Sequence, residues 1–382
     1  MKFLRISLLN IVYFGIQAPF IYLSTYALAL GVPDDLLSIL IGVSFLAAFL
    51  GQFFWGALSD RIRSTKKIMV ICTLLSIADF LVMWFLKSVP VFAVTYIALG
   101  FFISPAISIL DSWSLDLLDY DSSSYGNVKS IGAIGFAGAM LALGYLIEKA
   151  GFTTLFVSGL LFCVLCILLS LSLPDKQFRT AAVSEKGKLD LSIFRNTTFI
   201  LLLVSVFLVG LAIAPPNNLK ILIIQQAGGT VADMGIDNGV GYAIQALMYA
   251  AAGHLSGRHP YRNLNTAIIC TAAGMLCAAF ASNIWMVYLS TLLIYGAFSV
   301  ENTVIRMLSR RLFAPEHLTT VLSIIDAVFL QLAGFIGLVA AGGIIARTSL
   351  VTLMLICFAL CVLAVGTVSL MALHRSNQKT AA

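Results

Sequence analysis

The stretch Ser349–Leu373, SLVTLMLICFALCVLAVGTVSLMAL, contains no charged side chain in 25 residues. About 20 apolar residues are enough for an α-helix to cross the hydrocarbon core of a bilayer. The apolar residues form a continuous run instead of alternating with polar ones, and only helices and closed barrels satisfy their backbone in lipid. The stretch therefore predicts a transmembrane helix.

Eleven further runs of this kind fill most of the chain. Of its 382 residues 60% are hydrophobic and 10% are charged, whereas about a quarter of a soluble domain is charged. We predict an all-α polytopic membrane protein with short loops. The twelve expected helices cover approximately residues 4–30, 36–58, 67–86, 91–116, 126–148, 151–173, 199–222, 235–256, 264–282, 285–308, 319–345 and 349–373.

Lysine and arginine residues are strongly biased to one side of these spans. Four of them, Lys87, Lys149, Lys220 and Arg347, fall on one side, against seventeen on the side of both termini. Because cytoplasmic loops are enriched in Lys and Arg, we expect both termini in the cytoplasm and a place in a bacterial inner (plasma) membrane. The net charge of +6 then reflects topology, and we expect no nucleic-acid partner.

The longest polar segment divides the chain six spans plus six. We predict an N-terminal bundle of residues 1–173, a cytoplasmic linker of 174–196 and a C-terminal bundle of 197–382. The motif Gly56-Ala57-Leu58-Ser59-Asp60-Arg61 after the second span is echoed by Gly253-His254-Leu255-Ser256-Gly257-Arg258 after the eighth. Duplicated six-helix bundles are one transporter plan, with substrate held near the membrane midplane.

The stretch Gly56–Lys67 resembles the loop 2–3 signature of the major facilitator superfamily. It matches through Arg61, but Arg63 stands where the family usually has Gly, and Ser64-Thr65 delay the basic pair Lys66-Lys67. A narrower resemblance is to the lactose permease, nucleoside and phenylpropionate proton symporters. It rests on Tyr13-Phe14-Gly15, Pro19-Phe20, Asp111 and Tyr125-Gly126-x-x-Lys129-x-x-Gly132, and that branch usually has Arg at the position of Lys129.

The family resemblance implies a conformational latch at Asp60 and Arg61. The Asp60 carboxylate would lie at the N-terminus of the eleventh span, near Thr319, where the helix dipole favours an anion. The alternative is that these residues only help to set topology.

Four spans carry polar residues at helical spacing. These stripes are Asn10, Tyr13, Gln17 and Ser24; Ser104, Ser108, Asp111 and Ser112; Asn238, Tyr242, Gln245 and Tyr249; and Thr291, Tyr295, Ser299, Asn302 and Arg306. Four aligned stripes favour a wet cavity. The alternative is hydrogen bonding between helices.

Charged residues inside the spans are expensive and usually face partners or water. Asp111 and Lys129 lie toward the ends of adjacent spans and are expected to pair. In the resembled branch an acid and a base on these two helices contact the substrate, and the alternative is a purely structural ion pair. For Asp79 we expect only a local hydrogen bond.

Two carboxyl groups, Glu301 and Asp326, are candidates for the coupling proton. Glu301 is five residues from Arg306, which places the two about 140° apart on a helix. We therefore expect Arg306 on the polar stripe and Glu301 to its side, facing Asp326 on the next span. Fixed pairing of either acid with a base is the alternative.

The seventh span is interrupted by Ala214-Pro215-Pro216-Asn217-Asn218. Prolines kink a helix and free backbone carbonyls. Asn217 and Asn218 are expected either to bind substrate or to satisfy that backbone.

These patterns favour a secondary active transporter that works by alternating access, with proton-coupled symport of a sugar or nucleoside. The expected substrate contacts are Tyr13, Gln17, Asp111, Lys129, Asn217, Asn218, Tyr242, Gln245, Asn302 and Arg306. We expect a monomer in the lipid bilayer whose partners are a small-molecule substrate and protons, with no catalytic residues, cofactor or metal. The alternatives are a proton-coupled exporter of drugs or metabolites and a membrane sensor or scaffold that transports nothing.

Overall fold

The structure is a computed structural model that describes residues 2–118, 122–175, 196–255, 259–313, 321–322 and 324–380. Most of the predicted linker, residues 176–195, lies outside the described residues, as do Ser256-Gly257-Arg258 of the repeated motif. Within the described residues the regular structure is entirely helical.

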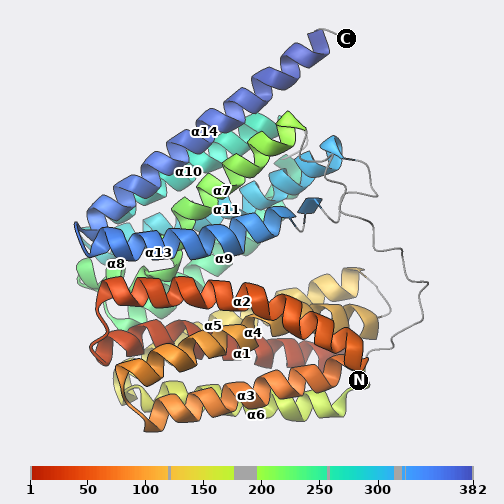
Figure 1. The fold of residues 1–382 in the computed structure, drawn as a ribbon, viewed down its shortest axis with the longest axis vertical. Coiled ribbons are helices and arrows are strands. Elements are labelled where there is room, and N and C mark those ends of the chain that lie inside the picture. Colours follow the sequence, from red (N-terminus) through yellow and green to blue (C-terminus); the bar gives the residue numbers. More distant parts are fainter. Residues whose placement is uncertain are drawn as a thin grey trace. The chain divides into compact units, whose positions relative to one another are not determined.

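Over the described residues 2–118 and 122–175 the first half of the chain forms six helices, which are labelled in Figure 1. They are α1 (Lys2–Ala29), α2 (Asp34–Ile62), α3 (Thr65–Phe85), α4 (Val89–Leu117), α5 (Ser122–Ala150) and α6 (Thr153–Ser172).

In the described part of the second half lie seven α-helices with assigned bounds and one π-helical segment, η2. They are α7 (Thr197–Asn218), α8 (Lys220–Gln226), α9 (Val231–Leu255), α10 (Pro260–Ala279), α11 (Ile284–Leu312), η2 (Ala327–Leu332), α13 (Ala333–Ile345) and α14 (Leu350–Thr380).

Ten helices in the described part of the chain are long and apolar enough to cross a membrane. The two other long helices, α9 and α10, fall on the predicted spans 235–256 and 264–282. With η2 and α13 counted as one span, the predicted architecture of twelve transmembrane helices in two pseudo-symmetric bundles is confirmed.

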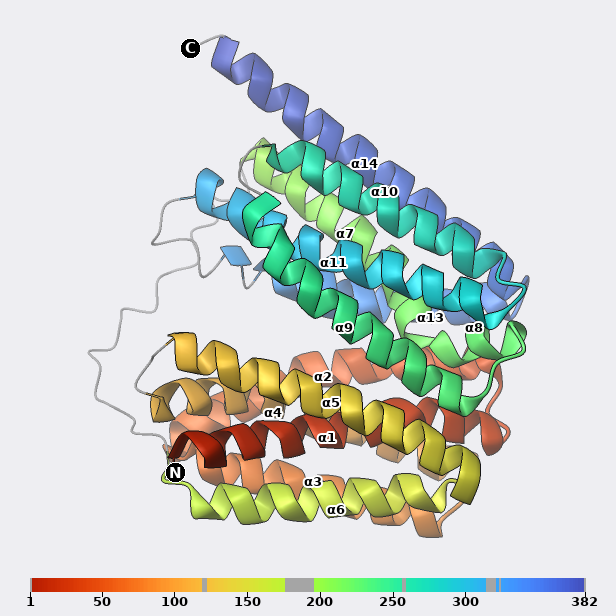
Figure 2. The ribbon, with the colours of Figure 1, turned by 180° about the vertical axis from the view of Figure 1, so that it is seen from behind.

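The helices cluster into two compact units. The first comprises Met1–Val183 with Thr230–Gly239, and the second comprises Ser184–Gly229 with Val240–Ala382. In the first unit α1 packs on α5 and α6, and α3 packs on α4 and α6; in the second, α7 packs on α13 and α14, and α10 packs on α11 and α14. Figures 1 and 2 show α3 beside α6 and α10 beside α14. The same packing order thus occurs twice.

The turn between α2 and α3 accounts for the departures from the family signature. Arg63 ends α2 in the left-handed conformation, with φ 52° and ψ 41°, which is the conformation that favours Gly. Ser64 is the N-cap of α3 and accepts a hydrogen bond from the backbone N–H of Lys67. The two residues that delay the basic pair therefore provide a helix start.

The end of α6 is fastened to this turn. The Asp175 carboxylate accepts hydrogen bonds from the Ser64 hydroxyl and the Lys66 backbone N–H. The Lys66 ammonium donates to the carbonyls of Leu171 and Leu173 at 2.9 and 2.8 Å. Lys66 thus satisfies carbonyls that the end of a helix leaves without partners.

Two features of the second unit differ from the sequence prediction. The predicted span 199–222 ends at Asn218, and the chain continues into the short helix α8. Lys220 was counted among the basic residues on the external side, and its side chain is only 2% exposed. The predicted span 319–345 contains the π-helical segment η2, which its continuous apolar pattern did not indicate.

Candidate functional site: ion pairs and free amides within the spans

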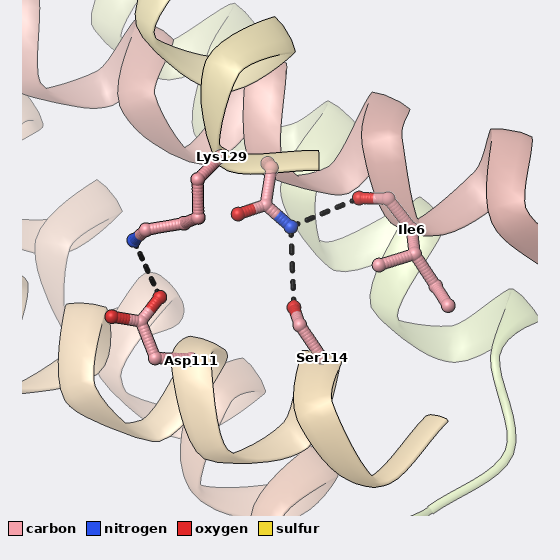
Figure 3. A network of polar contacts seen from close by, with 5 residues as sticks. Ile6, Asp111, Ser114 and Lys129 are labelled. Carbon is pink, nitrogen blue, oxygen red and sulfur yellow. Dashed lines mark hydrogen bonds and ion pairs between the residues drawn. The ribbon is translucent and has the colours of Figure 1, made fainter. Parts of the chain in front are cut away.

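The first unit holds an ion pair between α4 and α5. Lys129 Nζ lies 2.5 Å from Asp111 Oδ1, and each side chain is 29% exposed. Figure 3 shows the two side chains pointing toward one another from their helices. The Lys129 ammonium also lies 4.9 Å from the centre of the Phe14 ring, a cation–π distance. The predicted pairing is confirmed, and the partial exposure leaves room for further hydrogen bonds.

Two polar residues of α1 are engaged in helix packing instead. The Asn10 amide donates to the Ile6 carbonyl at 3.0 Å and to the Ser114 hydroxyl at 3.2 Å (Figure 3). The Tyr13 hydroxyl donates to the Ile103 carbonyl, and Tyr13 is 2% exposed. Both side chains join α1 to α4 here, and the substrate contact of Tyr13 stays a prediction.

The second unit holds an ion pair of its own. Arg306 Nη2 on α11 lies 3.3 Å from Oδ2 of Asp326, with the side chains 49% and 40% exposed. Pairing of this acid with a base was the alternative to a proton-carrying Asp326. The pair lies on the predicted polar stripe of α11, at the N-cap of η2.

Glu301 has a different environment from Asp326. It is 1% exposed, and its Oε1 accepts a 2.8 Å hydrogen bond from the Thr271 hydroxyl of α10. The expectation that Glu301 faces Asp326 is therefore wrong, because its side chain turns toward α10. Glu301 Oε2 has no hydrogen-bond partner among the residues that are described.

The amide side chains inside the spans fall into two groups. Those of Asn10, Asn218, Asn238 and Asn265 each donate a hydrogen bond to another helical residue. A second group makes no side-chain hydrogen bond within the described ranges and includes Gln17, Asn217, Gln245, Asn302 and Gln331.

This division separates neighbouring residues. The Asn218 amide donates to the Ala214 carbonyl at 2.8 Å, whereas Oδ1 of Asn217 is enclosed and has no partner in the described part of the chain. Unbonded buried polar atoms are costly, so the free group marks where water or a ligand is needed. Gln17, Asn217, Gln245 and Asn302 were predicted as substrate contacts, and Gln331 was not.

An aromatic and basic cluster lies beside the stripe of α11. The rings of Tyr242 and Tyr295 meet edge to face at 5.6 Å. The Lys220 ammonium donates to the Thr291 hydroxyl at 2.6 Å and lies 5.8 Å from the centre of the Tyr295 ring. Sequence reasoning missed Lys220 because it stands at the edge of an apolar run. The break at Pro215-Pro216-Asn217-Asn218 was the signal for a new helix there.

The other candidate residues make no described contact that supports their predicted roles. Asp60 and Arg61 are exposed, and Thr319, the expected partner of the latch, lies outside the described residues, so the latch stays a prediction. The local hydrogen bond expected for Asp79 is not found among the described residues, where its Oδ2 is buried without a partner. Within the same ranges no three His, Cys, Asp or Glu side chains are placed to hold a metal ion.

A sequence model of one protein family matches almost the whole chain. The sequence model of the MFS_1 like family matches residues 3–372. The chain belongs to this family of major facilitator superfamily transporters. The resemblance seen in the Gly56–Lys67 signature is thereby confirmed, together with the coarse assignment as an integral membrane transporter.

Two curated relatives and one solved structure place this MFS_1 like protein further. It is 28% identical to the maltose permease of Geobacillus stearothermophilus over 281 residues, which are 72% of this chain and 70% of that one. It is 26% identical to the uncharacterized transporter YwbF of Bacillus subtilis (strain 168) over 186 residues, 48% of this chain and 46% of the relative, so that match spans less than half of YwbF. The crystal structure of the nucleoside transporter NupG superposes with a TM-score of 0.84 at 14% identity, over 97% of this chain and 98% of that one. At that identity the likeness to NupG shows the fold.

Proposed function

We propose that this chain is a proton-coupled symporter of a neutral, hydroxyl-rich solute, a sugar or a nucleoside. One observation carries the substrate class: each unit holds an acid–base pair that stays partly exposed inside otherwise apolar helices, Asp111–Lys129 in one and Asp326–Arg306 in the other. A carboxylate accepts hydrogen bonds and an ammonium or guanidinium donates them, so a pair matches neighbouring hydroxyl groups.

The free amides support the same substrate class. Gln17 in the first unit and Asn217, Gln245 and Asn302 in the second carry donors and acceptors that no described residue uses. Amides bond hydroxyls in both directions, and Tyr242 and Tyr295 offer faces for a sugar or base. The relative named maltose permease is in keeping with a sugar.

We assign the coupling proton to Glu301 ahead of Asp326. Asp326 has a basic partner in Arg306, whereas the fully buried Glu301 has only the Thr271 hydroxyl among the residues with described positions. A charge without compensation in an apolar interior is costly, and such a group neutralises itself by binding a proton. Release of that proton then requires a change of surroundings, which is what alternating access supplies.

The proposed orientation places both termini in the cytoplasm of a bacterial inner membrane, and the proposed working unit is a monomer without enzymatic activity. Arg5 and Lys66 both donate hydrogen bonds to carbonyls at the end of α6, so the start of α1, the start of α3 and the end of α6 share one basic end. Positive residues favour the cytoplasmic side.

Uptake into proteoliposomes tests the proposal. Protein is reconstituted and offered radiolabelled maltose, D-xylose or uridine with the vesicle interior made alkaline, and an equal-pH control is run beside it. Gradient-driven accumulation of one of these solutes is expected. Binding of the solute without flux under any gradient would instead indicate the sensor or scaffold, and flux of none of them would reject the substrate class.

A further inference from the structure

The helix that follows Asp326 is wound as a π-helix over Ala327–Leu332 before it continues as α13. A π turn bonds each residue to the fifth one along, and such single turns inside α-helices occur frequently at functional sites. The fifth residue after Asp326 is Gln331.

The π winding changes which side chains share a face. On an α-helix of 3.6 residues per turn, a step of five residues makes one full turn plus about 140°. The side chain of Gln331 would then point away from that of Asp326. With i to i+5 bonding, the two residues stack along one face of the helix. Gln331 thereby follows the Arg306–Asp326 ion pair on the same side.

Packing holds the segment in this winding. A Cβ atom added at Gly210 of α7 would lie 2.5 Å from the Phe329 carbonyl oxygen and 2.7 Å from the Ala333 Cβ, so only glycine allows α7 this close. The Phe329 ring stacks on Phe298 of α11 with centroids 5.7 Å apart. The π segment is thus fixed by α7 and by α11.

Nothing in the described chain uses the Gln331 amide. Its Oε1 is enclosed and lacks a hydrogen bond, so this acceptor carries a desolvation penalty that a ligand donor would relieve. In the second unit the Asn218 and Asn265 amides each donate a hydrogen bond to another residue, although Asn265 Oδ1 also lacks a partner. Gln331 lies five residues after Asp326 of the ion pair.

We propose that Gln331 is a substrate-binding residue whose amide oxygen accepts a hydrogen bond from a hydroxyl of the solute held at Arg306–Asp326. The inference rests on the proposed function and sharpens it. Asp326 and the Gln331 amide oxygen present acceptors, and the Arg306 guanidinium presents donors. A hydroxyl group fits these groups, because it can donate to an acceptor and accept from a donor at once.

The test measures binding to purified full-length protein by titration calorimetry. The probe is maltose, D-xylose or uridine, whichever binds most tightly, together with its set of single-deoxy analogues. Two variants are compared with the unchanged chain: Gln331→Leu, and Leu330→Ala as a matched control on the exposed side of the same segment.

The unchanged protein should bind one deoxy analogue about tenfold more weakly than the parent solute, as expected for one lost hydrogen bond. In Gln331→Leu the parent should weaken by a similar factor, and the preference over that analogue should disappear. Leu330→Ala should bind the parent solute and every analogue as the unchanged chain does. A purely structural role for Gln331 would weaken the parent and every analogue alike and leave all preferences intact.

Two other results overturn the inference in distinguishable ways. If Gln331→Leu binds the parent and all analogues as the unchanged protein does, the role of Gln331 is wrong and the proposed function stands. If the unchanged protein binds none of the three solutes, the proposed substrate class fails and takes the inference with it.

Discussion

Glu301 on α11 and Thr271 on α10 are joined by a 2.8 Å hydrogen bond in which the threonine hydroxyl donates to the carboxyl group. The second carboxyl oxygen, Oε2, is buried and has no partner in the described parts of the chain. The carboxyl group therefore sits between two helices that pack tightly in the second unit, away from the ion pair of Arg306 and Asp326.

Replacing Glu301 with Gln should uncouple transport from protons. The amide keeps the shape and can still accept the Thr271 hydrogen bond, but it cannot bind or release a proton at neutral pH. Accumulation driven by a pH gradient should be lost, while exchange of labelled for unlabelled solute across the membrane continues. Both are measured in the same proteoliposomes.

Asp326→Asn is the comparison for Glu301→Gln. It removes a charge from an ion pair, so it should weaken solute binding and exchange together. Loss of gradient-driven accumulation in Asp326→Asn with exchange intact, and retention of it in Glu301→Gln, would reverse the assignment of the proton.

The effects of replacing Asp111 and Lys129 on protein stability should not be additive. Either Asp111→Asn or Lys129→Met leaves one charge uncompensated in a largely apolar setting, which costs about 3–5 kcal/mol when fully buried and less here, where each side chain is 29% exposed. The double variant should recover most of the thermal stability but not the solute affinity. Melting temperature and binding of the same preparations separate the two effects.

Lys129→Arg is the conservative control for this pair, because it keeps the charge. It should retain binding and stability. Equal affinity in Lys129→Met and the unchanged protein would reduce the ion pair to a structural element.

Asn217 and Asn218 should separate affinity from stability in adjacent positions. Asn218→Ala removes the 2.8 Å bond to the Ala214 carbonyl and should lower stability by about 1 kcal/mol with little change in affinity. Asn217→Ala removes an amide that no described residue uses and should weaken solute binding by about threefold to tenfold without lowering the melting temperature. The opposite pattern would mean that the free amide group does not mark the binding surface.

Arg63→Gly should stabilise the protein. Arg63 holds φ 52°, a conformation that costs a non-glycine residue about 1–2 kcal/mol and costs glycine little. Part of that gain is offset by the extra freedom of glycine in the unfolded chain. Thermal unfolding in detergent should shift upward in Arg63→Gly but not in Arg63→Ala, which removes the same charge and keeps the Cβ atom.

The predictability of the helices follows from the solvent they meet. A run such as Ser349–Leu373 must make its backbone hydrogen bonds within itself in lipid, whichever helices surround it. The helix α14 accordingly begins at Leu350. The π winding of η2 could not be seen in this way, since Ala327–Leu332 is as apolar as an α-helical span. It depends on how closely α7 approaches at Gly210, which is a contact between segments more than a hundred residues apart.

The candidate site divides along the same line. The pairing of Asp111 with Lys129 followed from two charges on adjacent spans, because each is costly alone in lipid. The identity of the free amides did not follow, since Asn217 and Asn218 are the same residue type side by side. Likewise, Glu301 was expected to face Asp326, and only the packing of α10 on α11 turned it toward Thr271.

By itself the sequence determined that this chain crosses a membrane many times, that its halves repeat, and that a few charged and amide residues lie within the spans. These properties depend on the transfer of side chains and backbone from water to lipid, and each span carries them alone. The tertiary structure decided which polar groups are already hydrogen-bonded and which remain available. A donor or acceptor is engaged only when a particular partner lies within about 3 Å of it.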